Sequence, residues 1–354
     1  MLLDNLCGTL EDSKVIVLDE AKANRLYNKG YYGIPLSGGG LELDLYEARY
    51  LMETERLEVM DGSGEKVTPS TLIERSLSLD SRSTLIYPVY SDMRQRGYVL
   101  KDASSPADFR VFPRGGGPGK TPTKYWLIVS AETDRFFLPE TEEVCNRIMD
   151  LKKELLVATL DEEGDVTYHK ISTIDLKGDD RTDHIKDTYE GVIYGDRCLM
   201  FDGGEINENH FFGRHIADGI QLSLVETQYL LEKGILTVFN GGTGDVMDLT
   251  EFHEYASKKQ KDYPVRYTVY KDLRNKGVIP KTGFKYGTAF RCYLGDPEDH
   301  HADYIIQPVG EDFECSRYDT SRAVRVAHSV RKSFAFARSG KNGVTYTKME
   351  RETP

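Results

Sequence analysis

The chain of 354 residues carries a net charge of −12 and contains five scattered cysteines without a CxxC pair: Cys7, Cys145, Cys198, Cys292 and Cys315. Its length predicts two or more domains, and no apolar run approaches the ~20 residues of a membrane span, so we expect neither a membrane segment nor a secretory leader. The cysteine pattern argues against a disulfide framework or a structural zinc site and indicates a reducing compartment, which we take to be the cytoplasm.

The sequence contains an internal repeat. Matching segments recur at an offset that drifts only between 178 and 181 residues: 49–53 with 228–232, 85–97 with 265–277, 109–112 with 290–293, and 166–168 with 344–346. Because the offset is nearly constant over the whole length, we infer a tandem duplication. We call residues 1–175 repeat 1 and residues 176–354 repeat 2.

The first part of each repeat, residues 1–84 and residues 176–263, is expected to form a small α/β domain. In repeat 1 a β-rich run at 14–18 and a helical stretch at 43–53 alternate. In repeat 2 this part, residues 176–263, begins with a polar linker, residues 176–189. We therefore predict a linker and an N-terminal domain at the start of repeat 2.

The second part of each repeat, residues 85–175 and residues 264–354, is expected to form a mixed sheet flanked by helices. It opens with a helix that a glycine ends, and it closes with another helix and a hairpin. The predicted elements are helices at 87–96, 267–276 and 320–334, strands at 109–112, 125–130, 290–294 and 304–309, and hairpin turns at 160–165 and 338–343. The expected fold class is α/β (mixed α+β) in tandem duplication.

Three side chains in repeat 2 suit the cleavage of a phosphodiester by a neighbouring hydroxyl. Tyr293, His301 and Lys332 are separated by 8 and 31 residues. An imidazole, with an ordinary pKa of about 6.5, can protonate a leaving oxygen, and a phenol beside cations can take a proton. An ammonium can stabilise the charge that develops on phosphorus. We predict that Tyr293 is the base, His301 the acid and Lys332 the fixed charge, with no metal and no cofactor.

Repeat 1 differs from repeat 2 at these positions. Phe112 stands opposite Tyr293, Pro122 opposite His301, and, by counting along the sequence, Glu154 opposite Lys332. These replacements remove the hydroxyl, the imidazole and the positive charge. We therefore expect residues 85–175 to be catalytically idle and residues 264–354 to be active.

At these positions the chain resembles the catalytic core of the archaeal tRNA-splicing endonucleases, in their homodimeric tandem-repeat form. The resemblance lies in Tyr286-Gly-x-x-Phe-Arg-x-Tyr293, His301-x-x-Tyr304 and the basic segment from Arg322 to Lys332. It implies cleavage of precursor tRNA at a bulge-helix-bulge by attack of a ribose 2′-OH, which leaves a 2′,3′-cyclic phosphate and a 5′-OH. It also implies a homodimer, in which two chains supply two active sites.

The resemblance further implies two arginines that hold an extruded base and an acidic loop that contacts the other chain. The segment from Arg322 to Lys332 holds four positive charges and no acid, a local cationic face on an acidic protein. Seven residues separate Arg325 from Lys332, so one helix would place both on one face. We expect Arg325 and Arg351 to contact RNA. The expected dimer contact is the loop with Asp161, Glu162, Glu163 and Asp165.

Two alternatives remain open from the sequence. A non-catalytic RNA-binding or assembly subunit of a splicing endonuclease would share the repeats without cutting. Carboxylates in Asp296-Pro-Glu-Asp299 could instead bind a divalent metal and support a DNA nuclease. Cleavage of an intron-bearing transcript in excess chelator separates these alternatives from the endonuclease.

Overall fold

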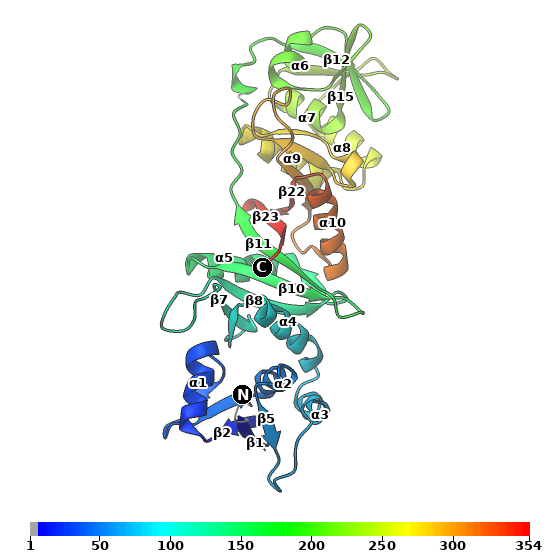
Figure 1. The fold of residues 1–354 in the computed structure, drawn as a ribbon. Coiled ribbons are helices and arrows are strands. Elements are labelled where there is room, and N and C mark those ends of the chain that lie inside the picture. The colour runs from blue at the N-terminus through cyan, green and yellow to red at the C-terminus, as the bar shows by residue number, and fades with distance from the viewer. Residues whose placement is uncertain (1–5, 181) are drawn as a thin grey trace.

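The computed structural model describes residues 6–180 and 182–354 of an elongated molecule. The N-terminal domains of the two repeats lie at opposite ends, and the C-terminal domains meet in the middle (Figure 1). The mixed α/β class and the tandem duplication are confirmed. Every helix of the described residues is too short or too polar to cross a bilayer.

Each N-terminal domain packs helices on a mixed sheet. In repeat 1 the sheet order is β3-β4-β2-β1-β5, and in repeat 2 it is β14-β15-β13-β12-β16-β17. Repeat 1 contributes β1 (Cys7–Glu11), β2 (Lys14–Val17), α1 (Glu20–Gly30), β3 (Ile34–Pro35), β4 (Leu41–Asp44), α2 (Leu45–Glu53), β5 (Glu58–Met60) and α3 (Pro69–Leu79). Repeat 2 contributes η1 (Thr182–His184), β12 (Tyr189–Tyr194), β13 (Arg197–Met200), α6 (Gly204–His210), β14 (Arg214–Ile216), β15 (Gly219–Ser223), α7 (Leu224–Glu232), β16 (Leu236–Asn240), β17 (Val246–Met247) and α8 (Leu249–Lys259).

The two C-terminal domains share one continuous sheet of order β18-β19-β20-β22-β23-β11-β10-β8-β7-β6. Repeat 1 supplies α4 (Ser83–Gln95), β6 (Val99–Asp102), β7 (Phe109–Phe112), β8 (Tyr125–Ala131), β9 (Arg135–Phe137), α5 (Leu138–Asp150), β10 (Glu154–Leu160) and β11 (Val166–Ile174). Repeat 2 supplies α9 (Tyr263–Asn275), β18 (Ile279–Thr282), η2 (Phe284–Tyr286), β19 (Phe290–Tyr293), β20 (Tyr304–Val309), β21 (Glu314–Ser316), α10 (Arg317–Ser329), β22 (Ser333–Gly340) and β23 (Gly343–Glu352).

A pseudo-twofold axis relates the two repeats. Where β11 and β23 pair antiparallel, Ile171 lies opposite Met349, the residue at the equivalent position of the other repeat. The short β9 and β21 pair in the same way, with Phe136 opposite Cys315. The axis therefore passes through both pairs, and the two repeats are packed as the two halves of a symmetric dimer would be.

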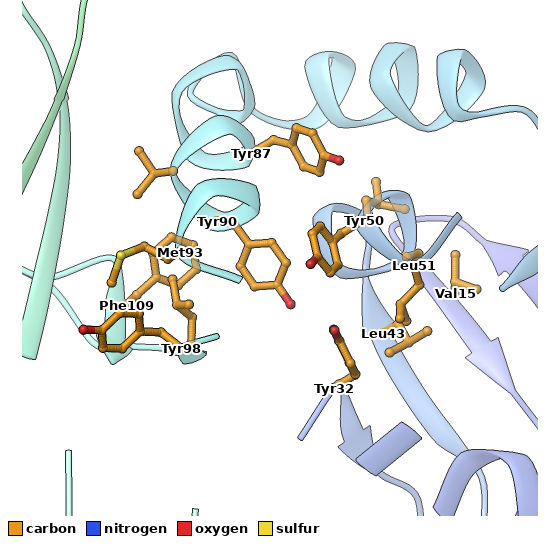
Figure 2. Close-up of a cluster of buried hydrophobic side chains, with 14 of the residues drawn as sticks. Val15, Tyr32, Leu43, Tyr50, Leu51, Tyr87, Tyr90, Met93, Tyr98 and Phe109 are labelled. Carbon is orange, nitrogen blue, oxygen red and sulfur yellow. The ribbon is translucent and has the colours of Figure 1, made fainter. Parts of the chain in front are cut away.

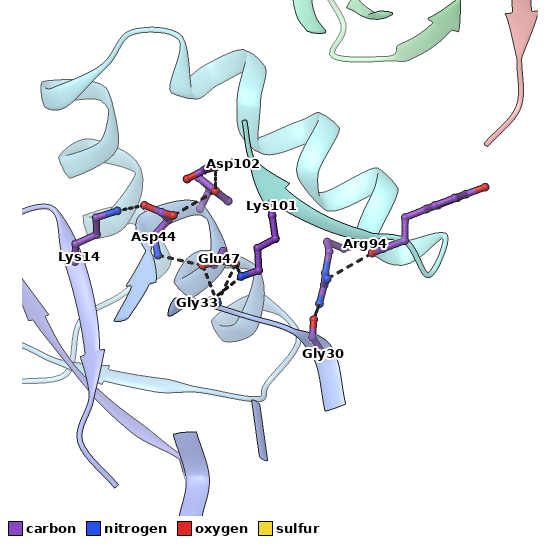
Figure 3. A network of polar contacts seen from close by, with 10 residues as sticks. Lys14, Gly30, Gly33, Asp44, Glu47, Arg94, Lys101 and Asp102 are labelled. Carbon is purple, nitrogen blue, oxygen red and sulfur yellow. Dashed lines mark hydrogen bonds and ion pairs between the residues drawn. The ribbon is translucent and has the colours of Figure 1, made fainter. Parts of the chain in front are cut away.

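A capping glutamate ties each N-terminal domain to its C-terminal domain. The Glu47 carboxylate accepts the N–H of Asp44 (3.3 Å), the residue that caps α2, and that of Gly33 (3.1 Å), while Lys101 Nζ donates to the Gly33 carbonyl (2.6 Å) (Figure 3). Gly33 has φ +64°, and a Cβ there would lie 2.3 Å from the Glu42 carbonyl oxygen, so only glycine fits. Repeat 2 has the same arrangement with Glu226, Gly213 and Lys281.

Tyrosines of α4 and α2 join the two domains of repeat 1 into one core. The Tyr90 ring points from α4 toward α2 and lies 5.9 Å from the Tyr50 ring and 6.0 Å from the Phe109 ring (Figure 2). The buried cluster that they form extends from Val15 in the N-terminal sheet to Leu160 in the central sheet. Because aromatic pairs add to the energy of burial, the contact stabilises the junction. The domain limits at residues 84, 175 and 263 stay predictions.

A buried ion pair joins the two repeats on one side of the pseudo-twofold axis. Arg338 of β22 donates from Nε (2.8 Å) and from its terminal nitrogen (2.5 Å) to one Glu142 carboxylate oxygen, and Thr347 Oγ1 donates to the other (2.7 Å). The Glu142 side chain on α5 is 4% exposed. Such a pair holds its partners in register because either group alone would be a buried, uncompensated charge.

The segment that connects the repeats docks against repeat 2. The Gly178 N–H donates to the Lys276 carbonyl (2.9 Å), and a Cβ at Gly178 would lie 2.2 Å from the Gly277 carbonyl oxygen. The Asp179 N–H donates to the Leu294 carbonyl (3.1 Å). The connection therefore reaches the residue that follows Tyr293, which makes it part of the frame around the candidate site.

Candidate active site

His301 and Lys332 line one cavity in repeat 2. The cavity has a volume of about 840 Å³ and is bordered by Leu294, residues 301–304, residues 328–329 and residues 331–333. His301 is exposed in the loop before β20, and Lys332 is half-buried before β22. Because β20 and β22 are adjacent and parallel, the segments that precede them meet at the same edge of the sheet.

Ala302 connects all three residues that the sequence singled out. It follows His301 directly, and its carbonyl accepts a hydrogen bond from Lys332 Nζ (2.8 Å). Its side chain packs with Tyr293 and Ile279 in a small buried cluster. Ala302 is thus the chain neighbour of the residue with the imidazole, the hydrogen-bond acceptor of the ammonium and a member of the same buried cluster as the phenol ring.

Tyr293 is the most deeply placed of the three. It ends β19 opposite Ile279 of β18 and is 8% exposed. The Arg291 guanidinium lies 5.8 Å from the centre of its ring. Tyr293 is not one of the described residues that line the cavity, but it belongs to the same buried cluster as Ala302, which does line it. The structure thus brings His301 and Lys332 into one cavity, and Tyr293 is connected to it through the Ala302 cluster without lining it.

Asp303 fixes the loop that carries His301. Its N–H donates to the Cys292 carbonyl (2.9 Å), its carbonyl accepts the Ser333 N–H (3.0 Å), and its carboxylate accepts the Leu294 N–H (3.0 Å). These bonds join β19, the loop and β22. Burial raises the pKa of the neighbouring Cys292 thiol, which disfavours a thiolate nucleophile next to Tyr293.

The prediction of one helix from 320 to 334 was wrong at its end. The helix α10 ends at Ser329, and Lys332 follows it in a turn where Arg331 has φ +57°. The turn is closed by a hydrogen bond from the Lys332 N–H to the Ala327 carbonyl (3.0 Å). Arg325 and Lys332 therefore do not share a helix face, and that argument for Arg325 is lost.

The prediction that Glu154 stands opposite Lys332 was also wrong. In repeat 1, Lys152 has φ +57°, as Arg331 has, and the Lys153 N–H donates to the Ile148 carbonyl (3.1 Å). Lys153 is therefore the counterpart of Lys332, and Glu154, which begins β10, is the counterpart of Ser333, which begins β22. Repeat 1 keeps the ammonium and lacks the phenol and the imidazole.

The residues expected to contact RNA are not among the described residues that line the cavity. Arg325 is exposed on α10, and Arg351 is exposed on β23 opposite His169 of β11. His169 is buried, and its pKa is lowered to about 4 by desolvation and then by the charges of Arg317, Arg351 and Arg325. The two arginines therefore face the same region beside the pseudo-twofold axis, and their contact with RNA stays a prediction.

The His169 site predicts a loss of stability in acid. Since the folded pKa is about 4 and the ordinary value 6.5, the unfolded chain takes up a proton between these pH values that the folded chain does not. The free energy of unfolding should fall through this window by about 1.4 kcal/mol per pH unit, or roughly 3 kcal/mol in all, because of this group alone. In urea unfolding, the decrease in the free energy of unfolding from pH 6.5 to pH 4.5 should be smaller for His169→Gln than for the wild type, by the part that is due to His169. The exposed control His215→Gln should show the same decrease as the wild type.

The acidic loop predicted as a dimer contact is an exposed hairpin tip between β10 and β11. The Asp161 carboxylate accepts the N–H groups of Glu163 (3.0 Å) and Asp165 (2.9 Å), which closes the turn and leaves Glu162 and Glu163 exposed. The contact with a second chain stays a prediction. In the described part of the chain, no three His, Cys, Asp or Glu side chains converge in a way that could hold a metal ion.

Sequence reasoning missed two titratable side chains of the cavity. His328, in the last turn of α10, and Asp303 both border it, yet neither was singled out. The signal for His328 was the comparison of the repeats, because Met149 takes its place in repeat 1. Asp303 makes two of its three bonds through its backbone and one, to the Leu294 N–H, through its carboxylate, and bonds to backbone groups leave little signal in the sequence.

Comparison with known proteins agrees with both parts of each repeat. The family model of the tRNA intron endonuclease catalytic C-terminal domain matches residues 84–168 and 263–346, and that of the N-terminal domain matches residues 7–73 and 189–252. A tRNA-splicing endonuclease of Methanococcoides burtonii is 37% identical over 339 residues, which cover 93% of this chain and 95% of that protein. Those of Methanosarcina acetivorans and Halobacterium salinarum are 33% and 30% identical, over 97% and 93% of this chain and 98% and 94% of theirs.

Proposed function

Since this chain belongs to the tRNA intron endonuclease family, an endonuclease family of tRNA splicing, we propose that it cuts precursor tRNA at a bulge-helix-bulge by attack of the ribose 2′-OH, without a metal. The products would be a 2′,3′-cyclic phosphate and a 5′-OH. RNA selectivity follows from this chemistry, because DNA lacks the attacking hydroxyl.

The proposed reaction needs two proton transfers and one fixed charge. Tyr293, as the phenolate, accepts the proton of the 2′-OH, and the 2′ oxygen forms a bond to phosphorus. As the bond from phosphorus to the 5′ oxygen breaks, His301 donates a proton to that oxygen. The Lys332 ammonium stabilises the charge on the phosphorane. Each acid–base role contributes ~10²–10⁴ in rate, and alignment of the reacting oxygens supplies more.

The arrangement around Ala302 is the observation that best supports this proposal. One residue carries His301 as its neighbour, holds Lys332 Nζ by its carbonyl at 2.8 Å and packs against Tyr293. Separations in sequence of 8 and 31 residues are thereby reduced to contacts with one short loop. Such a loop can hold an acid and a charge against the same phosphate.

Assembly and RNA binding complete the proposal. Two chains would form a homodimer in which the acidic loop with Asp161, Glu162, Glu163 and Asp165 reaches the active repeat of the partner. The loop is exposed and has the negative charge that a cationic surface would attract. Arg325 and Arg351, both exposed, would stack on an unpaired base, because a guanidinium plane packs on a base face.

A cleavage assay with an intron-bearing precursor tRNA tests the proposed function. In excess EDTA the purified protein should release the intron at an unchanged rate, and the upstream fragment should carry a cyclic phosphate that resists phosphatase until acid opens it. A requirement for Mg²⁺, or a 3′-OH end, would contradict the proposed chemistry. Binding without cutting would favour the non-catalytic subunit.

A further inference from the structure

A second cavity lies in repeat 1, far from the candidate active site in sequence and on the other half of the molecule. It has a volume of about 830 Å³ and opens between α2, α3, α4 and the loop after β6. Its lining comes from residues 44–49, 73–80, 82–88 and 102–109, with Ser13. The proposed reaction gives this cavity no role.

The equivalent space in repeat 2 is filled by a tyrosine. Helices α4 and α9 have the same length, and Ser83 begins the first where Tyr263 begins the second. Tyr263 is fully buried, and its hydroxyl donates to the Leu224 carbonyl (3.2 Å) and to Gln228 Oε1 (2.7 Å). Its ring stacks on that of Tyr267 at 6.1 Å and an angle of 9°.

The surroundings of that tyrosine reappear around the cavity. The residues that contact Tyr263 have counterparts in repeat 1 that line the open space: Leu45 for Leu224, Arg49 for Gln228, Tyr87 for Tyr267, and Ile73 for His253. Ser83 lines it as well. The cavity is therefore the place of a stacked aromatic ring from which the ring is missing.

The walls of the cavity suit a flat, hydrogen-bonding ring. The Arg49 guanidinium lies 3.5 Å above the centre of the Tyr87 ring, where it covers one face of that ring, and its Nε pairs with Glu53 (2.7 Å). Both side chains line the space, which therefore offers a flat cation backed by an aromatic ring. Both kinds of surface stack on nucleobases.

The polar end of the cavity has acceptors for N–H groups. Asp44 and Asp102 line it together, and the Tyr46 hydroxyl lies between them, hydrogen-bonded to Asp102 and 3.3 Å from Asp44 Oδ2. The other oxygen of Asp44 is paired with Lys14, so Asp44 Oδ2 and the Asp102 carboxylate are the oxygens left to accept from a ligand (Figure 3). Repeat 2 has Ser223, Val225 and Thr282 at the positions of Asp44, Tyr46 and Asp102. The carboxylates are therefore a property of repeat 1 alone.

We propose that this cavity binds a nucleobase with an exocyclic amino group, its ring in the place that Tyr263 fills in repeat 2. The base stacks on the Arg49 guanidinium, which itself lies over the Tyr87 ring, and its N–H groups donate to Asp44 or Asp102, as carboxylates accept from amino groups of bases. The base belongs either to a free nucleoside or to an unpaired nucleotide of bound RNA. The RNA source rests on the proposed function, and the free nucleoside does not.

Equilibrium dialysis with the full chain tests the proposal. The probes are labelled guanosine, adenosine, cytidine and uridine, and the single-stranded RNA decaadenylate. Ser83→Tyr restores the residue of repeat 2 and should lower the affinity for the bound probes at least about tenfold, the order of one lost base stack. Uridine, which has no amino group, should bind weakest. The control Ser81→Tyr adds a ring at an exposed position outside the cavity and should change affinity less than about twofold.

A second variant guards against misfolding, and the outcomes separate the sources. Arg49→Gln also introduces the residue of repeat 2 and should weaken binding, and Ser83→Tyr should melt no lower than the wild type because its ring fills a void. Nucleosides that compete with decaadenylate identify a free ligand, and binding of decaadenylate alone identifies RNA. Absence of binding by every probe, or equal binding by Ser83→Tyr, overturns the proposal. Because dialysis measures binding without cleavage, a failure of the proposed reaction would not mimic either result.

Discussion

Replacing His301 by alanine should lower the rate of precursor cleavage by ~10²–10⁴-fold and leave the affinity for precursor tRNA within about twofold. His301 lies exposed in the cavity that Lys332 also borders, so its loss removes the proton donor without disturbing a buried contact. Single-turnover cleavage with enzyme in excess measures the chemical step, and a filter-binding titration measures affinity.

The neighbouring histidine provides the matched control. His300 is exposed, precedes His301 directly and does not line the cavity among the described residues. His300→Ala should therefore cut at a rate within about threefold of the wild type. Equal losses in both variants would mean that the loop, and not the imidazole of His301, limits the reaction.

Replacing Glu142 by alanine should lower the free energy of unfolding by about 3–5 kcal/mol. Arg338, whose side chain is 19% exposed, would keep its charge without the carboxylate that now accepts two of its hydrogen bonds, and Thr347 would lose its acceptor. Urea unfolding followed by circular dichroism measures the change.

The adjacent glutamate separates this effect from a general effect on α5. Glu143 pairs with Arg147 at the surface, where side-chain exposures of 69% and 62% let water screen the charges. Glu143→Ala should change stability by less than about 0.5 kcal/mol. A Glu142→Ala variant as stable as the Glu143→Ala variant would show that the pair does not hold the repeats together.

Much of the architecture was predictable because duplication makes the sequence its own comparison. The helix of α9, the strands 109–112 and 304–309 and both hairpins were placed within a few residues of their observed ends. The segment after α10 was not, because apolar spacing continues past Ser329 as if the helix did. The left-handed Arg331 ends it, and a non-glycine residue in that conformation gives no signal in sequence.

Lys153 of repeat 1 is a second case in which the sequence alone did not give the correct position. Counting along an offset that drifts by up to three residues selected Glu154, whereas the hydrogen bond from the Lys153 N–H to the Ile148 carbonyl fixes the register. For the site, the sequence could name Tyr293, His301 and Lys332 from their chemistry. It could not show that one alanine carbonyl holds the ammonium, because backbone groups are the same in every residue.

The ion pair between Glu142 and Arg338 has no counterpart at the position related to it by the pseudo-twofold axis. By the symmetry of the repeats, Ser321 takes the place of Glu142 and Thr159 that of Arg338 on the other side. Two copies of the first half alone would place Glu142 beside Thr159 and His169, the counterpart of Thr347, without the guanidinium, and two copies of the second half would leave the Arg338 guanidinium without a carboxylate. The ion pair therefore favours association of one first half with one second half over association of either half with itself. Halves produced as separate polypeptides should form the heterodimer in preference to either homodimer.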